Sequence, residues 1–367
     1  MHAITVTVNG QPPAVVSTGT RISDLLPSVN GDGFPVLGAI ANNMVLPLFM
    51  PLVADATLAP LTLQNPHGWD IYRTSLCFLL AKTAHELYPG LECRVRNSVG
   101  AGLYCTVQWP DLSPAALDAH VKRLKEAMLE AVRQDLSISP VTVSYEAATR
   151  LFSESGQSDK LHLLAHRNPP IVCLAQCGSF FELSQEPLVP RTGLLELFDL
   201  IPHSSGFVLN VPTSSPPREL PPLPPYEHLF TVYQEHIAWG KIVGITTVGQ
   251  LNQAVLEKRA DDFVHTVEAL HDKKLARIAD AVTQRAPDVR LVLVAGPSSA
   301  GKTTFSKRLV THLRVNGYRP ILISTDSYFV GDARNPRDAA GNLDYEHIES
   351  MDLPRLNSDL LRLMAGE

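Results

Sequence analysis

The chain has 367 residues, of which 45% are hydrophobic and 19% are charged, and its formal net charge is −6. This composition excludes a disordered or fibrous protein. The acidic balance excludes a general nucleic-acid binder, which needs an excess of Lys and Arg. Because single hydrophobic cores stop growing at about 250 to 300 residues, we expect more than one domain.

The sequence carries no signal for a membrane or for secretion. No run of about 18 apolar residues is present, and the first residues alternate like a strand instead of following the layout of a signal peptide. The five cysteines are scattered and form no CxxC pair, which is typical of a reducing compartment. We therefore expect a cytoplasmic protein that contacts no membrane.

Residues 1–64 are predicted to form a small β-rich domain. Residues 4–8 alternate between apolar and polar side chains, and Asn9-Gly10 is a strong signal for a hairpin turn. The order of the elements predicts a β-grasp fold. Its other predicted members are a returning strand at 14–16, a short helix at 22–26, and a strand at 36–41 that turns at Asn42-Asn43.

Residues 65–211 are predicted to form an α+β domain. Apolar residues at helical spacing predict a helix that closes at Pro89-Gly90, and Ser113-Pro114 predicts the start of a second one. The buried stripe of the second helix is predicted to comprise Leu117, Val121, Leu124, Met128 and Val132. Strands are predicted at residues 103–107, 141–145 and 171–175.

Residues 212–286 are predicted to connect this domain to the last one. Seven of the fourteen residues in 212–225 are Pro, which prevents regular helix or sheet and favours a stiff linker. A PxxP ligand for a partner is the alternative interpretation. A long amphipathic helix follows and stops before Pro287. Its apolar face is predicted to comprise Leu256, Ala260, Phe263, Val267, Leu270, Ile278 and Val282.

Residues 287–367 contain a predicted phosphate-binding loop. The apolar run 291–295 is typical of a buried parallel strand, a Walker A pattern follows it, and helix-forming sequence comes next. In that context backbone N–H groups and the helix dipole converge on phosphate oxygens, so we expect ATP and Mg²⁺ as cofactors. Lys302 is expected to reach the phosphates, and the Thr303 hydroxyl to bind Mg²⁺. The residues predicted to bind the cofactor are Gly296, Ser298, Ser299, Ala300, Gly301, Lys302, Thr303 and Thr304.

A second strand is predicted at residues 320–324, directly before Asp326. Open α/β sheets bind ligands at the carboxyl ends of their strands, so a carboxylate at this position is placed to take a proton from a hydroxyl or to contact Mg²⁺. The alternative is a loop Asp that caps a turn. Together with the phosphate-binding loop, the pattern favours a catalytic role for Asp326.

The loop, the stretch that starts at Asp326, and residues 338–352 together resemble the uridine kinase and phosphoribulokinase family. The resemblance implies that Asp326 is the base for a nucleoside 5′-hydroxyl and acts with Lys302. It also places Tyr328 and Asp344 near the nucleoside. Core packing for Tyr328 and a turn carboxylate for Asp344 are equally open alternatives.

The front of the chain resembles the N-terminal part of threonyl-tRNA synthetases, a TGS module followed by an amino-acid editing domain. The resemblance is carried by residues 36–46, 73–89 and 188–193. In the synthetases the editing domain has two His residues four apart on a helix, then a later Cys and His. The corresponding residues here are Arg73, Cys77, Ser184 and Leu188. Arg and Leu do not bind metals, so we expect no metal or hydrolytic site there.

The resemblances imply a multidomain α+β protein followed by α/β. Its predicted parts are a TGS-like β-grasp domain at 1–64, an editing-like α+β domain at 65–211, a Pro-rich linker and helical connector at 212–286, and the N-terminal part of a P-loop domain at 287–367. About 80 residues follow Pro287, which suffice for only part of a kinase fold. We therefore expect negligible kinase activity from this truncated chain itself.

The leading hypothesis is ATP- and Mg²⁺-dependent phosphoryl transfer to a nucleoside, with uridine favoured by the resemblance. The alternative hypothesis is a nucleotide-sensing regulator that binds RNA through its TGS-like and editing-like modules. A third hypothesis, an editing hydrolase, is weakened by the missing ligands. The sequence predicts neither the acceptor nucleoside nor the oligomeric state.

Overall fold

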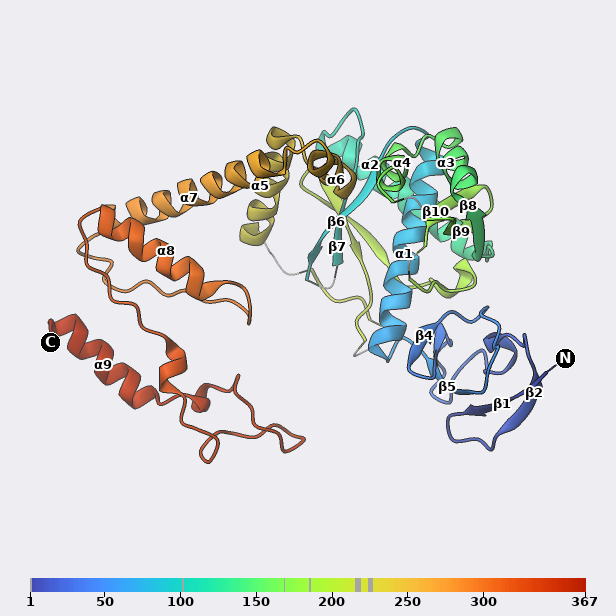
Figure 1. Ribbon diagram of the computed structural model, residues 1–367, viewed down its shortest axis with the longest axis horizontal. Helices are drawn as coiled ribbons and strands as arrows, with labels where there is room; N and C mark the ends of the chain where they lie inside the picture. The colour runs from blue at the N-terminus through green and yellow to red at the C-terminus, as the bar shows by residue number, and fades with distance from the viewer. Residues whose placement is uncertain (1, 101, 168, 185, 215–218, 224–226) are drawn as a thin grey trace. The chain divides into compact units, whose positions relative to one another are not determined.

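The structure, a computed structural model, describes residues 2–100, 102–167, 169–184, 186–214, 219–223 and 227–367. Contacts divide the chain into a first unit, residues 1–257, and a second unit, residues 258–367. Helices and strands alternate along the first unit, and helices dominate the second (Figure 1). The predicted general class, a mixed α/β protein with several sheets, is confirmed.

The first 64 residues contain a five-stranded sheet with the order β2-β1-β5-β3-β4. β1 and β5 run parallel, and the other neighbours are antiparallel. Both predicted hairpins are confirmed, since β1 pairs with β2 after a turn at Gly10, whose φ is +75°, and β3 pairs with β4 across Asn42-Asn43. The elements are β1 (Ala3–Val8), β2 (Ala14–Ser17), the 3₁₀ turn η1 (Ile22–Asp24), β3 (Gly38–Ala41), β4 (Met44–Leu46) and β5 (Ala56–Leu61).

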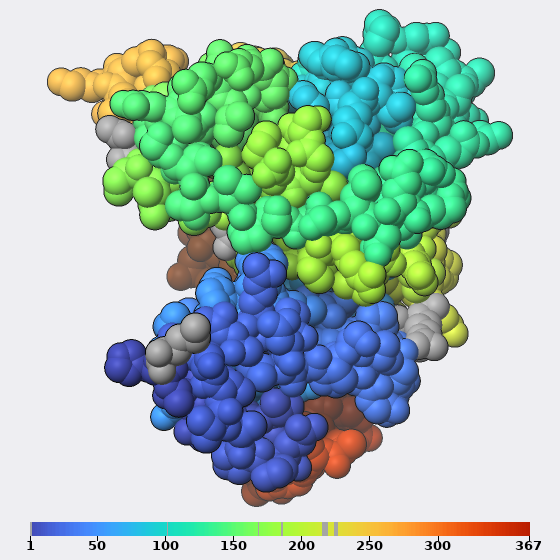
Figure 2. All heavy atoms as spheres, turned by 90° about the vertical axis from the view of Figure 1, so that its right-hand side faces the viewer, coloured from blue at the N-terminus to red at the C-terminus, as the bar shows by residue number. Residues whose placement is uncertain are grey.

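These strands enclose a core of their own, around the fully buried Ile22 and Leu58. Their residues form a compact blue lobe in Figure 2. The lobe is closely joined to the helix that follows it. A Cβ atom on Gly68 would lie 2.0 Å from the carbonyl oxygen of Thr62, so only glycine permits this approach.

The remainder of the first unit contains two further sheets, with the orders β11-β12-β7-β6 and β10-β9-β8. Its strands are β6 (Cys93–Val99), β7 (Gly102–Val107), β8 (Ser139–Ser144), β9 (Ile171–Cys177), β10 (Phe180–Leu183), β11 (Asp199–His203) and β12 (Gly206–Asn210). Its helices are α1 (Pro66–Leu87), α2 (Pro114–Arg133), α3 (Tyr145–Glu154), α4 (Ser158–Leu164), the 3₁₀ turn η2 (Thr192–Leu194), α5 (Glu227–Val243) and α6 (Val248–Leu256).

The largest core of the first unit lies between the four-stranded sheet and the helices α1 and α2. The predicted stripe on α2 is confirmed for Leu117, Val121, Leu124 and Met128, which are all buried, while Val132 is only partly buried and packs against the same core. Pro114 is the first helical residue of α2, as predicted. The three strands predicted for this region are observed as β7, β8 and β9.

The second unit contains three α-helices among its described residues. They are α7 (Ala260–Gln284), α8 (Lys302–Val315) and α9 (Leu353–Ala365), with 3₁₀ turns η3 (Thr325–Tyr328) and η4 (Ile348–Ser350). The predicted connector helix is observed as α7, which begins at Ala260 because α6 ends at Leu256 and Lys258 adopts a φ of +59°. α7 and α8 pack through Leu275, Ala279, Leu309 and Leu313. An ion pair of 2.6 Å between Arg308 and Asp272 also joins them.

The strands predicted at 291–295 and 320–324 are not formed. Both segments are irregular, and Leu293 and Ile321 expose 82% and 70% of their surfaces. A parallel strand is stable only when neighbouring strands bond its backbone and helices cover its faces. The described residues of the second unit supply no such neighbouring strand, so the two apolar segments do not form a sheet.

Two other predictions concern the linker and the membrane. The predicted Pro-rich linker, 212–225, lies in part outside the described residues, since 215–218 and 224–225 belong to the undescribed positions. Within the described ranges, no helix is long and apolar enough to span a bilayer.

Candidate functional site

The predicted phosphate-binding loop is compact and leads directly into α8. Ser299 and Gly301 have φ values of +61° and +81°, and α8 begins at Lys302. The ammonium of Lys302 donates hydrogen bonds to the carbonyl oxygens of Gly296 at 2.6 Å and Pro297 at 2.9 Å. The lysine is therefore folded back over the loop at the N-terminus of α8.

The other predicted kinase residues are not assembled around this loop. Asp326 is exposed in η3, and the Tyr328 hydroxyl donates to Asp359 on α9 at 3.0 Å. Asp344 accepts the N–H of Glu346 at 3.0 Å, the geometry of a turn carboxylate. Among the described residues no hydrogen bond or ion pair joins Asp326, Tyr328 or Asp344 to the loop.

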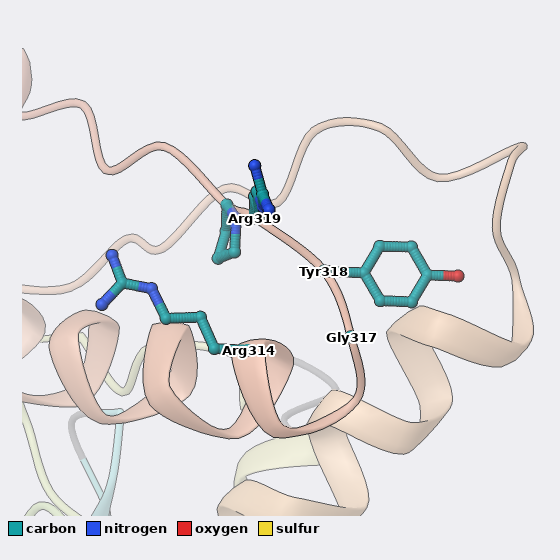
Figure 3. Close-up of a pocket in the computed structure, with 5 residues that line it drawn as sticks. Arg314, Gly317, Tyr318 and Arg319 are labelled. Atoms are coloured by element: carbon teal, nitrogen blue, oxygen red, sulfur yellow. The ribbon is translucent and has the colours of Figure 1, made fainter.

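A hollow of about 470 Å³ lies where α8 ends. Its lining residues are Arg314, Gly317, Tyr318, Arg319 and Pro320. Figure 3 shows that the Arg314 guanidinium and the Tyr318 ring point away from one another. The hollow therefore offers no group of side chains that converge on a ligand.

In the first unit, the positions matched to the editing domain have structural partners. Arg73 pairs with Asp70 at 3.2 Å and lies over the Trp69 ring, with 4.7 Å between its guanidinium carbon and the ring centroid. The Ser184 hydroxyl donates to the Glu186 carbonyl oxygen, and Leu188 is buried in the core. These side chains do not form a cluster of potential ligands.

Three thiols gather beneath the four-stranded sheet, from α1 (Cys77), β6 (Cys93) and β7 (Cys105). Burial raises the pKa of Cys77 to about 11. Burial, with the neighbouring Cys77 thiol, raises the pKa of Cys93 to about 12. Burial and the other two thiols also raise the pKa of Cys105 well above its ordinary value. All three thiols are therefore neutral at physiological pH and are poor nucleophiles.

An ionic cluster lies beside Cys93. The Lys160 ammonium contacts Glu182 at 2.9 Å and Asp159 at 3.0 Å, and the Lys160 and Glu182 side chains are only 22% and 21% exposed. Burial acts to lower the pKa of Lys160, but the two carboxylates outweigh it and raise that pKa. Burial raises the pKa of Glu182, and Lys160 opposes this. With both carboxylates ionised the cluster carries one net negative charge.

No local sequence signal marks the thiol group or the ionic cluster. Lys160 lies in a short helix and Glu182 in a strand after it, and each looks like an ordinary surface charge when its neighbours along the chain are considered. Only the folded topology brings them to Cys93. Within the described part of the chain, no group of three or more His, Cys, Asp or Glu side chains is placed to hold a metal ion.

Comparison with known proteins identifies threonine--tRNA ligases among the relatives of this chain. No protein-family model matches the chain. The threonine--tRNA ligase of Syntrophotalea carbinolica is 28% identical over 160 residues, which cover 43% of this chain and 25% of the relative. The threonine--tRNA ligases of Rubrobacter xylanophilus and Geobacillus kaustophilus are each 29% identical, over 50% and 52% of this chain and over 28% and 29% of their own lengths.

The chain thus matches less than a third of the length of these relatives and resembles them at low identity over about half of its own length. The predicted resemblance to threonyl-tRNA synthetases is confirmed at this general level. The nucleoside kinase prediction is wrong, and so is the uridine partner, because the relatives are tRNA ligases and none of those compared is a kinase. Their names point to tRNA and an amino acid as partners.

Why the loop suggested a kinase is clear from the structure. The motif predicts a turn before a helix, and this turn is present. A kinase also needs a sheet edge that brings Asp326 to the phosphates, and the described residues of the second unit form no sheet. The local motif was therefore insufficient to predict the enzyme class.

Proposed function

We propose that the first unit binds tRNA in a role related to the attachment of threonine. The observation that carries the proposal is the similarity to threonine--tRNA ligases over about half of the chain. With a net charge of −6 the chain is not a general polyanion binder, so binding depends on local basic side chains and on shape.

The chemistry of the first unit favours binding over catalysis. Hydrolysis of an ester needs an activated nucleophile or a metal-bound water. The raised pKa values of Cys77 and Cys93 keep both thiols protonated, and the described residues offer no metal-binding group. The ionic cluster around Lys160 has one excess carboxylate, which suits an ammonium or a hydroxyl group as a ligand.

The finer domain assignments are part of this proposal. We infer that residues 1–64 are a TGS-like β-grasp module, supported by the mixed sheet order β2-β1-β5-β3-β4. Residues 65–211 are the editing-like module, supported by the helix α1 packed against a four-stranded sheet. Residues 212–286 connect these modules to residues 287–367, in which α8 follows the glycine loop.

A second, separate candidate function is the binding of a nucleoside triphosphate at the loop that precedes α8. Its supporting observation is the backbone geometry, with positive φ at Ser299 and Gly301 immediately before the helix N-terminus. N–H groups at such a terminus attract phosphate, the Lys302 ammonium supplies a positive charge, and the Thr303 hydroxyl is the group that would hold Mg²⁺. A Cβ atom added to Gly296 would lie 3.6 Å from the Cβ of Ala300, at ordinary van der Waals distance across the loop.

Fluorescence anisotropy with labelled tRNA tests the first proposal. The full chain should bind threonine tRNA saturably. The logarithm of the association constant should fall linearly with the logarithm of the salt concentration. A second tRNA and a single-stranded DNA of equal length are controls for shape. A folded protein that shows no saturable binding at low salt would remove the proposal.

Isothermal titration with ATP and Mg²⁺ tests the second proposal on the same full chain. We expect binding to the unaltered protein and a loss of at least about tenfold in affinity for Lys302→Ala, because a charge-assisted contact is removed. Lys307→Ala, on an exposed position of α8, is the matched control. Equal affinities for the three proteins would contradict the assignment of the loop.

A further inference from the structure

Two arginines lie on one face of an edge strand. Arg94 and Arg96 are two residues apart on β6, and Arg96 lies where the register of β6 shifts, between Val95 and Ser98. The contact of Arg96 with Thr106 places both arginines on the same face of the sheet. Thr106 of β7 is opposite Arg94, and its hydroxyl accepts a hydrogen bond from Nε of Arg96 at 3.2 Å. Among the described residues, β6 is the last strand in the order β11-β12-β7-β6.

The charge of Arg94 is already neutralised. Its Nε and one terminal nitrogen donate to the two carboxylate oxygens of Glu92 at 2.5 and 2.6 Å, and its other terminal nitrogen lies 3.4 Å from the Thr246 hydroxyl. Gln108 donates to the same carboxylate at 3.0 Å. Glu92 is therefore fully engaged and leaves little capacity for a second guanidinium.

Arg96 is not neutralised in this way. It is half-buried, and in the described ranges its hydrogen bond to Thr106 is its only polar side-chain contact, with no carboxylate at ion-pair distance. Burial lowers the pKa of Arg96 and the charge of Arg94 lowers it further, while Glu92 and Tyr104 act in the opposite direction. A partly buried guanidinium without a carboxylate partner of its own gains from an anion that is supplied from outside.

We propose that Arg96, positioned by Thr106 and with Arg94 beside it, binds a backbone phosphate of the tRNA. This inference rests on the proposed binding of tRNA by the first unit. The terminal N–H groups of Arg96 form a planar fork that matches two phosphate oxygens. Phosphate contacts fix the position of a nucleic acid without reading its sequence, so Arg96 contributes affinity and not selectivity.

Three variants separate the charge from its positioning. Arg96→Ala removes the fork, Arg96→Lys keeps a positive charge without the fork, and Thr106→Val removes the hydroxyl that orients the guanidinium. Arg150→Ala is the matched control, because Arg150 is an exposed arginine on α3 of the same unit. Urea unfolding of each variant establishes that it is folded.

Binding to threonine tRNA and to a second tRNA is then measured over a range of salt concentrations. Arg96→Ala should weaken binding to both tRNAs by a similar factor of about tenfold, and it should reduce the salt slope by about one. Arg96→Lys should restore the slope but only part of the affinity, and Thr106→Val should weaken binding less than Arg96→Ala. Arg150→Ala should have neither effect.

The outcomes distinguish this inference from the proposal beneath it. If the unaltered chain binds no tRNA, the proposed function fails. If it binds tRNA and Arg96→Ala binds with the same affinity and salt slope, the phosphate site is wrong while the function stands. A slope that falls equally for Arg96→Ala and Arg150→Ala would also contradict the site, because the effect would then be one of total charge.

Discussion

The two units differ in how completely they bury their apolar residues. The first unit packs α1 and α2 against its four-stranded sheet, and side chains such as Leu76 and Leu124 are completely buried. In the second unit α7 and α8 cover one another through four buried residues, while the apolar run 291–294 lies open to solvent. An amphipathic helix needs one neighbouring surface, but an apolar strand needs partners at both edges and on both faces.

The largest effect expected from this difference is on stability. Leu76→Ala removes a fully buried side chain of α1 and should lower the free energy of unfolding by about 2–5 kcal/mol. Leu293→Ala, at a residue that is 82% exposed, should change it by less than about 0.5 kcal/mol. Urea unfolding followed by circular dichroism measures both. Equal losses would show that the run at 291–294 is packed in solution.

Alkaline pH should destabilise the first unit next most strongly. The folded pKa values of Cys77 and Cys93, about 11 and 12, exceed the ordinary value of 9.0, so the folded state holds these protons more tightly. The stability that these protons contribute is therefore fully present below about pH 9. It declines as the pH rises towards the folded pKa values. Urea unfolding at a series of pH values tests whether the free energy of unfolding falls as the pH rises above about 9.

Thiol reactivity provides an independent check of that burial. Cys173 is exposed and should react first with an alkylating reagent in the native protein. Cys77 and Cys93, which are half-buried and have raised pKa values, should react much more slowly, and the buried Cys105 should react only after unfolding. Mass spectrometry of digested peptides assigns each site. Rapid labelling of Cys93 in the native protein would contradict the buried thiol group.

A smaller effect is expected from the ionic cluster. Lys160→Ala leaves Glu182 and Asp159 without their shared cation, and it should cost about 1–3 kcal/mol, because these groups are largely but not fully buried. Arg133→Ala removes an exposed partner of Glu130 and should leave stability nearly unchanged. Thermal unfolding of the two variants compares them. An equal decrease in Tm for both would mean that the Lys160 cluster is solvated.

The sequence predicted those elements whose signals are local. Asn9-Gly10 determines a hairpin turn, and Pro114 marks the first residue of a helix, without help from distant parts of the chain. The loop before α8 belongs to the same class. The helices α1 and α2 and the two hairpins of residues 1–64 could therefore be predicted, whereas α3 to α6 were not.

Contacts between distant elements could not be predicted in this way. The segments 291–295 and 320–324 have the composition of strands, but composition does not supply the neighbours that a sheet requires. Likewise, no local pattern connects Lys160 with Glu182, or Arg96 with Thr106. The motif at 296–303 indicated a loop correctly and an enzyme class incorrectly for the same reason.

Hydrogen exchange of the full chain with and without threonine tRNA is the decisive measurement for tRNA binding by the first unit. We expect slower exchange in peptides of the first unit when tRNA is added, including those of β6 and β7, and no change in the segment 291–295. Unchanged exchange throughout residues 1–257 at saturating tRNA would contradict the proposal that the first unit binds tRNA.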